Sequence, residues 1–276
     1  QLFVWLPDHL SLMPGDNIYR TFPNLYTIRG TTHRDVAGWV NSLDHMRSFR
    51  PQFLFPSHTK PLSGNAVMET LTIYRDAIQY IHDQTVRLMN KGLTPDEIIE
   101  KIELPKKLAE SPFLSEFYGT IRWSVKSIFN GYLGWFSGNP TELDPLSTAE
   151  SAKRLSELLG GDDKIFLALE EAVLNKDMQW ALELSDQLIA LEYSLRKVYQ
   201  LKREALLYIG KRSSNPNKRN YFLTSAIELD EAFKGFSPTI TTEGVVNEIS
   251  MNTMFARPTD GMLVDVHPTR AIVCPP

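Results

Sequence analysis

Two residues with metal-binding side chains follow turn-forming sequences in the first quarter of the chain. His58 lies in "PQFLFPSHTKPLSG" (residues 51–64), where a short predicted strand is ended by proline and glycine. Asp16 lies in "MPGDNIYR", another loop at a strand end. Each fits an ordinary loop residue, but imidazole nitrogen and carboxylate oxygen are also zinc ligands. The chain contains no HxH, HxxxH, HExxH or CxxC motif, so these two candidates do not complete a metal-binding signature.

A second set of residues could bind an anion. Arg29 ends "NLYTIRG", and Asn24 opens the same segment with an amide donor. Guanidinium pairs in a two-pronged way with sulfate, phosphate or carboxylate, although a surface arginine is the ordinary alternative. His33 and Arg34 extend the cationic patch "RGTTHRD", which equally fits a loop before a helix.

The stretch of residues 118–140 is rich in aromatic side chains, which we interpret mainly as packing residues. Tyr132 is the exception, because Gly131 and Gly134 flank it and could present its hydroxyl at a cleft. His82 falls within a predicted helix and is interpreted as structural. No glycine-rich phosphate loop occurs, and residues 147–233 hold no nucleophile–base arrangement.

The elements that would position these residues form an α/β pattern over residues 1–65. The segments "LFVWLP", "NLYTIRG" and "FLFP" are predicted strands. Between the second and third lies a predicted helix, "RDVAGWVNSLDHMRSF". Its apolar side chains share one face: Val36, Trp39, Val40, Leu43 and Met46. Strand, helix and strand in this order are typical of a layered α/β domain.

The chain becomes helical after residue 65. A long apolar-periodic helix is predicted to stop at Gly92, and Thr94, Pro95 and Glu97 predict a capped helix start. Four further helical patterns in residues 147–233 indicate stacked antiparallel hairpins. Residues 234–244 are a candidate linker.

Bulk composition excludes several classes. The chain has 276 residues, a net charge of −4 and one cysteine. These values argue against a nucleic-acid-binding surface and exclude an internal disulfide, and no apolar run is long enough for a membrane span. The chain does not begin with methionine, and we expect it to be part of a longer protein.

Four long segments resemble the alkyl sulfatases of the metallo-β-lactamase superfamily, of the linear alkylsulfatase type. They are "PGDNIYRTFPNLYTIRGTTHRDVAGWVNSLDHMRSF", "FLFPSHTKPLSG", "YRDAIQYIHDQTVRLMNKGLTPDEI" and "YGTIRWSVKSIFNGYLGWFSGNPTEL". The resemblance implies the C-terminal part of a metallo-β-lactamase-like αββα domain over residues 1–75. It also implies an all-helical dimerisation domain over residues 76–235 and the start of a sterol-carrier-like α+β domain over residues 245–276.

The resemblance further implies a centre that holds two zinc ions when complete. His58 matches the last zinc-binding histidine of the family. Asp16 matches a metal-binding position where relatives carry glutamate. The HxHxDH motif that supplies most other ligands would lie upstream of Gln1, so this chain is expected to supply part of the site.

Sulfate binding is implied for three residues. Asn24 and Arg29 match the residues that hold the sulfate group, and Tyr132 matches a tyrosine that contacts it from the helical domain. His33 joins them as a further catalytic candidate, and Pro23 departs from the family by standing where many relatives have histidine.

The implied function is zinc-dependent hydrolysis of alkyl sulfate esters to an alcohol and inorganic sulfate. The alternative is a non-catalytic dimerisation or assembly fragment. Expected partners are the alkyl sulfate, a second copy of the chain in a homodimer and, in one interpretation, a separate N-terminal segment that completes the site. The resemblance favours a periplasmic or secreted location over a cytoplasmic one.

Overall fold

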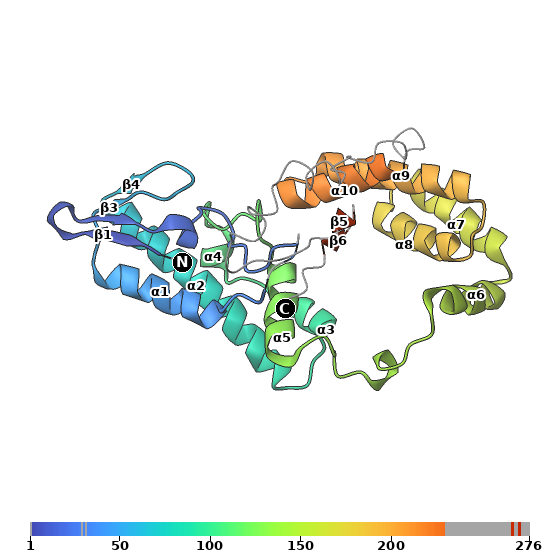
Figure 1. Cartoon of the computed structure of the whole chain (residues 1–276), viewed down its shortest axis with the longest axis horizontal. Coiled ribbons are helices and arrows are strands. Elements are labelled where there is room, and N and C mark those ends of the chain that lie inside the picture. Colours follow the sequence, from blue (N-terminus) through green and yellow to red (C-terminus); the bar gives the residue numbers. More distant parts are fainter. Residues whose placement is uncertain (1, 29, 31, 230–265, 268–269, 272–276) are drawn as a thin grey trace, which may run out of the picture.

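The computed structural model describes residues 2–28, 30, 32–229, 266–267 and 270–271. The predicted linker over residues 234–244 lies outside the described residues, as does most of the predicted sterol-carrier-like segment. Within that segment, β5 (Val266–His267) and β6 (Arg270–Ala271) form an antiparallel pair. The described chain is mostly helical with one small sheet near the N-terminus (Figure 1).

The small sheet has four strands in the order β1-β2-β3-β4. They are β1 (Val4–Leu6), β2 (Ser11–Met13), β3 (Phe53–Leu54) and β4 (Leu62–Ser63). The β1–β2 and β3–β4 pairs are antiparallel, whereas β2 and β3 are parallel. The parallel central pair matters for function, because residues that follow β2 and β3 emerge at the same edge of the sheet.

Helix α1 (Val36–Ser48) confirms the helix predicted between the strands. The Asp35 side chain accepts a hydrogen bond from the Gly38 amide at 2.8 Å and so caps the helix start. Four of the five apolar residues predicted for one face are buried, and Trp39 packs against them from the edge. The Trp39 indole N–H donates to the Asn17 carbonyl at 3.1 Å, which ties α1 to the loop after β2.

Helix α2 (Asn65–Met89) is the longest helix among the described residues and packs against α1. Its apolar stripe belongs to one core that extends from Leu12 of the sheet to Phe129 of the helical region. The boundary predicted between residues 75 and 76 falls inside α2 and stays a prediction. The helix was predicted to stop at Gly92 and ends three residues earlier, at Met89, whose carbonyl accepts a hydrogen bond from the Gly92 amide.

Three shorter helices complete the first group: α3 (Pro95–Ile99), α4 (Lys106–Ala109) and α5 (Ile121–Leu133). The predicted helix start at residue 94 is confirmed as a capping box, in which Thr94 and Glu97 satisfy each other's backbone amides. Helix α5 packs against α2 and α3 and carries Tyr132 near its C-terminal end.

Five helices form a second group with its own apolar core: α6 (Thr148–Leu159), α7 (Asp162–Leu174), α8 (Met178–Ala190), α9 (Leu195–Arg212) and α10 (Pro216–Glu228). The last four confirm the predicted hairpin helices, and α6 is an addition. Figure 1 shows α6 reached from α5 by an extended connection, with α10 returning toward the first group. Among the described residues, no helix has the length and apolar character that a membrane crossing requires.

One predicted strand is wrong. Residues 24–28 of "NLYTIRG" form a loop rather than a strand. The Arg34 guanidinium donates to the Asn24 carbonyl at 2.7 Å and to the Thr27 hydroxyl at 3.2 Å. This side chain therefore supplies part of the hydrogen bonding that a neighbouring strand would otherwise provide.

Candidate functional site

The structure brings Asp16 and His58 together. Asp16 lies in a 3-10 turn (Gly15–Asn17) after β2, and His58 lies in the loop after β3. Since β2 and β3 are parallel neighbours, both side chains reach the same edge of the sheet, and His58 Nε2 lies 3.4 Å from Asp16 Oδ1. The side chains are 57% and 59% exposed, so both remain accessible to a third group.

This pair of atoms fits two ligands of one zinc ion. Zinc bonds of about 2.0–2.2 Å at a tetrahedral angle separate two ligand atoms by about 3.3–3.6 Å. The observed 3.4 Å agrees with that spacing, and a carboxylate with an imidazole is a common zinc donor set. Within the part of the chain that the structure describes, no group of three or more His, Cys, Asp or Glu residues could hold a metal. Two ligands alone do not complete a zinc site, which takes four.

Asn24 has the environment of a ligand-binding amide. It is only 4% exposed, and neither its Oδ1 nor its Nδ2 has a hydrogen-bond partner among the residues that the structure describes. Burying an amide in this way costs about 1–3 kcal/mol unless another polar group pairs with it. A sulfate oxygen could accept from its Nδ2, which suits the predicted role. Arg29, the predicted partner of Asn24, lies outside the described residues.

A second loop holds Asn24 from the other side. The Gly119 amide donates to the Phe22 carbonyl, and a methyl group at Gly119 would lie 2.0 Å from the Pro23 carbonyl oxygen. The preceding residue, Tyr118, places its ring 5.1 Å from that of Tyr19. The Tyr19 ring in turn meets the His58 ring edge-on at 5.1 Å. A continuous set of contacts therefore joins Asp16 and His58 to the loop that carries Asn24.

Tyr132 and His33 form a separate contact at the end of α5. Their ring centroids lie 6.4 Å apart, and the His33 ring packs directly on Gly131. Tyr132 is 53% exposed, and its hydroxyl lies 2.7 Å from His82 Nε2 on α2. The prediction that glycines present Tyr132 agrees with its exposure, whereas its role toward sulfate stays a prediction. The contact between His82 and Tyr132 was not predicted from the sequence.

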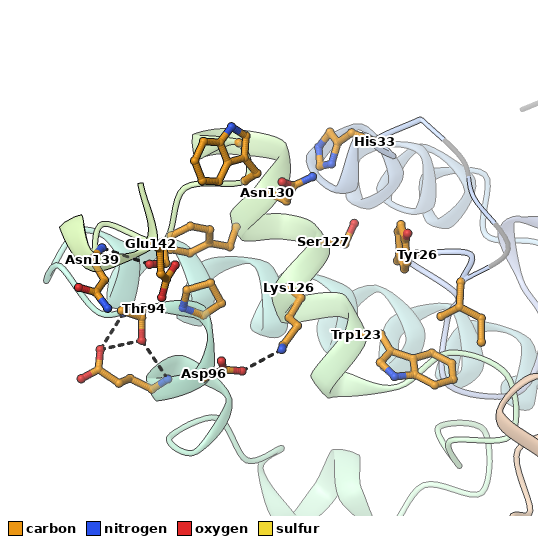
Figure 2. A pocket seen from close by; sticks show the side chains of 17 residues that line it. Tyr26, His33, Thr94, Asp96, Trp123, Lys126, Ser127, Asn130, Asn139 and Glu142 are labelled. Carbon is orange, nitrogen blue, oxygen red and sulfur yellow. Dashed lines mark hydrogen bonds and ion pairs between the residues drawn. The ribbon is translucent and has the colours of Figure 1, made fainter. Parts of the chain in front are cut away.

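A cavity of about 830 Å³ lies beside this contact, between α3, α5 and the connection to α6. Figure 2 shows His33 and Asn130 at one side, with Tyr26 and Trp123 along the wall. In the same view, Lys126 pairs with Asp96 at 2.9 Å. Three aromatic residues of the stretch 118–140 line this cavity: Trp123, Phe129 and Trp135.

Comparison with known proteins places the chain in a family. Residues 94–232 match the family described as "Alkyl sulfatase dimerisation". This match covers half of the sequence, and the chain therefore belongs to the alkyl sulfatase dimerisation family.

Individual relatives agree with this assignment. The chain is 46% identical over 238 residues to a linear primary-alkylsulfatase of Pseudomonas sp. (strain ATCC 19151), covering 85% of this chain and 45% of that protein. Another linear primary-alkylsulfatase of Pseudomonas sp. is 32% identical over 83% of this chain and 35% of the relative. The solved structure of the stereoselective inverting sec-alkylsulfatase Pisa1 from Pseudomonas sp. matches with a TM-score of 0.76 and 30% identity. That match covers 82% of this chain and 37% of Pisa1, so the chain spans less than half the length of these relatives.

Proposed function

We propose that this chain takes part in zinc-dependent hydrolysis of alkyl sulfate esters to an alcohol and inorganic sulfate, and that it supplies part of the site. The observation that carries the proposal is the 3.4 Å approach of His58 Nε2 and Asp16 Oδ1 at one edge of the sheet. The similarity to alkylsulfatases supports the substrate class. Asp16 and His58 would hold zinc, which lowers the pKa of a bound water toward neutral pH and so supplies a nucleophile.

The other residues of the chain would bind and orient the ester. The buried Asn24 amide can donate to a sulfate oxygen. Arg29, five positions further along the chain, would neutralise charge that is redistributed as the ester bond breaks. Tyr132 would donate its hydroxyl to the sulfate from the helical side. His33, whose ring contacts that of Tyr132, would donate a proton to the oxygen of the leaving alcohol.

A zinc titration with a kinetic assay tests this function. We expect the chain to bind zinc weakly, and Asp16→Asn and His58→Ala to abolish that binding, because two ligands without a third give little affinity. Asp8→Asn and His45→Ala are matched controls, since both replace exposed residues outside the pair. Sulfate release from decyl sulfate, measured with added zinc and again with chelator, reports catalysis. Zinc binding that is indifferent to both substitutions would contradict the proposal.

The second candidate function is assembly without catalysis. It is favoured by the family match over residues 94–232 and by leucines exposed on α6 and α7. A homodimer that binds no zinc through Asp16 and His58, and releases no sulfate from decyl sulfate, would support this role. Dimeric assembly by itself is compatible with catalysis if a separate N-terminal segment completes the metal site.

A further inference from the structure

Three side chains form a hydrogen-bonded series between α2 and α5. The Tyr132 hydroxyl lies 2.7 Å from His82 Nε2, and His82 Nδ1 lies 2.8 Å from Asp83 Oδ1. The His82 side chain is 16% exposed and therefore largely shielded from water. Its ring centroid lies 5.7 Å from that of Tyr132, so the two rings are held against each other as well as hydrogen-bonded.

The donors and acceptors of these three side chains allow two hydrogen-bonding arrangements, which differ in the protonation of His82. An ionised Asp83 can only accept, so Nδ1 of His82 must carry a hydrogen. If His82 is neutral, its Nε2 can only accept, and the Tyr132 O–H must point at it. If His82 is protonated, Nε2 donates to the phenol oxygen, and the Tyr132 O–H is free to donate elsewhere. Only the second state lets Tyr132 donate to an anion while its contact with His82 is kept.

The surroundings favour coupling between this series and an anion. Among the described residues, Asp83 on α2 pairs with His82, and His33 in the loop before α1 contacts the Tyr132 ring. Histidine is the side chain that ordinarily changes charge near neutral pH. A negatively charged ligand at Tyr132 would stabilise a protonated His82 through Coulomb attraction and through the freed hydroxyl.

We propose that His82 and Asp83 position the Tyr132 hydroxyl as a donor to a bound sulfate group, and that His82 takes up a proton when sulfate binds. This inference rests on the proposed function, because that function places sulfate at Tyr132. His82 is a positioning residue, since it acts through Tyr132 and does not touch the sulfate itself.

Inorganic sulfate is a direct probe, because Asn24, Arg29 and Tyr132 all belong to this chain. We expect Tyr132→Phe and His82→Phe each to weaken sulfate binding about tenfold, the value of one hydrogen bond to a charged group. The double variant should bind no more weakly than Tyr132→Phe alone, because His82 has no hydroxyl left to position. Effects that multiply in the double variant would show an independent structural role and overturn the proposal.

Two carboxylates on α2 provide a matched comparison. Asp83→Asn should weaken sulfate binding, because the amide no longer stabilises a protonated His82. Asp76→Asn should leave the affinity unchanged, since Asp76 pairs with Arg75 and not with His82. Equal effects of the two substitutions would contradict the assignment of Asp83. Circular dichroism of each variant confirms that the helices are retained.

Proton uptake gives a readout that packing alone would not change. Calorimetric titration of sulfate in buffers of different ionisation enthalpy should show uptake of up to one proton by the unmodified chain near neutral pH. His82→Gln should keep most of the affinity, because its side-chain amide can still donate to the phenol oxygen, but it should take up less proton than the unmodified chain. Uptake that is unchanged in His82→Gln would overturn the proposal.

The two proposals can fail separately. Sulfate binding that depends on His82, without turnover of decyl sulfate, would contradict the proposed catalysis and leave the Tyr132–His82–Asp83 series supported. Turnover of decyl sulfate, together with a sulfate affinity that does not change when His82 is replaced, would support the proposed catalysis and contradict the role of the Tyr132–His82–Asp83 series. A chain that binds no inorganic sulfate at all would overturn the role given to this series.

Discussion

Gly119 leaves no room for a side chain where two loops meet beside Asn24. An added Cβ would lie 2.0 Å from the Pro23 carbonyl oxygen and 2.8 Å from the Asn24 Cα. Because both neighbours are backbone atoms, Gly119→Ala should force the loops apart and lower the free energy of unfolding by about 2–3 kcal/mol. Denaturant unfolding followed by fluorescence measures this change.

Gly210 in α9 is the control for that substitution. A Cβ there would approach the Cδ2 and Cγ of Leu223 at 2.8 and 3.0 Å and the Cβ of Phe222 at 3.2 Å, so its nearest neighbours would be side-chain atoms of α10 and not backbone atoms. Gly210→Ala also gains helix propensity, so its net effect on unfolding should be small. An unfolding free energy that falls as far for Gly210→Ala as for Gly119→Ala would contradict the argument from backbone contact.

At this same scale, the sequence predicted some site residues and could not predict others. Asp16 and His58 were each expected at a strand end, and the parallel pairing of β2 with β3 explains why they meet. The contact of His82 with Tyr132 could not be predicted, since hydrophobic periodicity places a residue on its own helix and carries no information about the facing one.

Among the elements, α1 and α2 are joined by a charged contact at Asp44. The Arg75 guanidinium lies 3.1 Å from the Asp44 carboxylate, and Arg47 donates to it at 2.6 Å. Partial burial tends to raise the pKa of Asp44, but hydrogen bonds from Arg75 and Arg47 outweigh it and hold the pKa below its ordinary value of 3.8. The folded state therefore favours the ionised form.

This lowered pKa predicts a pH dependence of stability. A carboxyl group whose pKa is lower in the folded state contributes its full stabilisation above the unfolded value and loses it as pH falls through the folded value. Asp44→Asn should therefore reduce the loss of unfolding free energy between about pH 5 and pH 2. Urea unfolding at several pH values measures it, with Asp8→Asn as the control. An acid dependence that is the same in Asp44→Asn as in the unmodified chain would contradict the prediction.

Local signals predicted the elements that depend on local interactions. The capping box at Thr94 and the buried stripe of α1 involve residues within a few positions of one another, and both are confirmed. The predicted strand over "NLYTIRG" failed because Arg34, rather than a neighbouring strand, binds the Asn24 carbonyl. The alternation of apolar and polar residues could not distinguish a strand from a loop whose backbone carbonyl is hydrogen-bonded to a side chain.

At the scale of the whole molecule, the second helical group returns to the first through polar contacts. The Asn215 amide donates to the carbonyls of Glu116 and Tyr118 at 3.0 and 3.1 Å, and the Tyr221 hydroxyl donates to the Ile28 carbonyl at 2.9 Å. These contacts join α10 to the loop that carries Asn24 and to the loop of residues 110–120 that packs against it. Their partners are far apart in sequence, so no local pattern could have predicted them.

Two exposed leucines on the second helical group indicate where a second copy of the chain binds. Leu158 on α6 and Leu174 on α7 are 82% and 81% exposed, although a leucine gains about 1.5–3 kcal/mol when it is buried. This region lies within the part of the chain that matches the alkyl sulfatase dimerisation family. We therefore expect the chain to form a homodimer in which these leucines are covered.

Replacing both leucines tests this interface. The double variant Leu158→Glu, Leu174→Glu should weaken dimerisation at least tenfold, because each substitution removes apolar contact and places a charge in the interface. Sedimentation equilibrium over a range of micromolar concentrations measures the dissociation constant. Leu2→Glu is the matched control, since Leu2 is 81% exposed and lies near the small sheet. An unmodified chain that sediments as a monomer throughout this range, or a double variant that dimerises like Leu2→Glu, would show that these leucines do not form the interface.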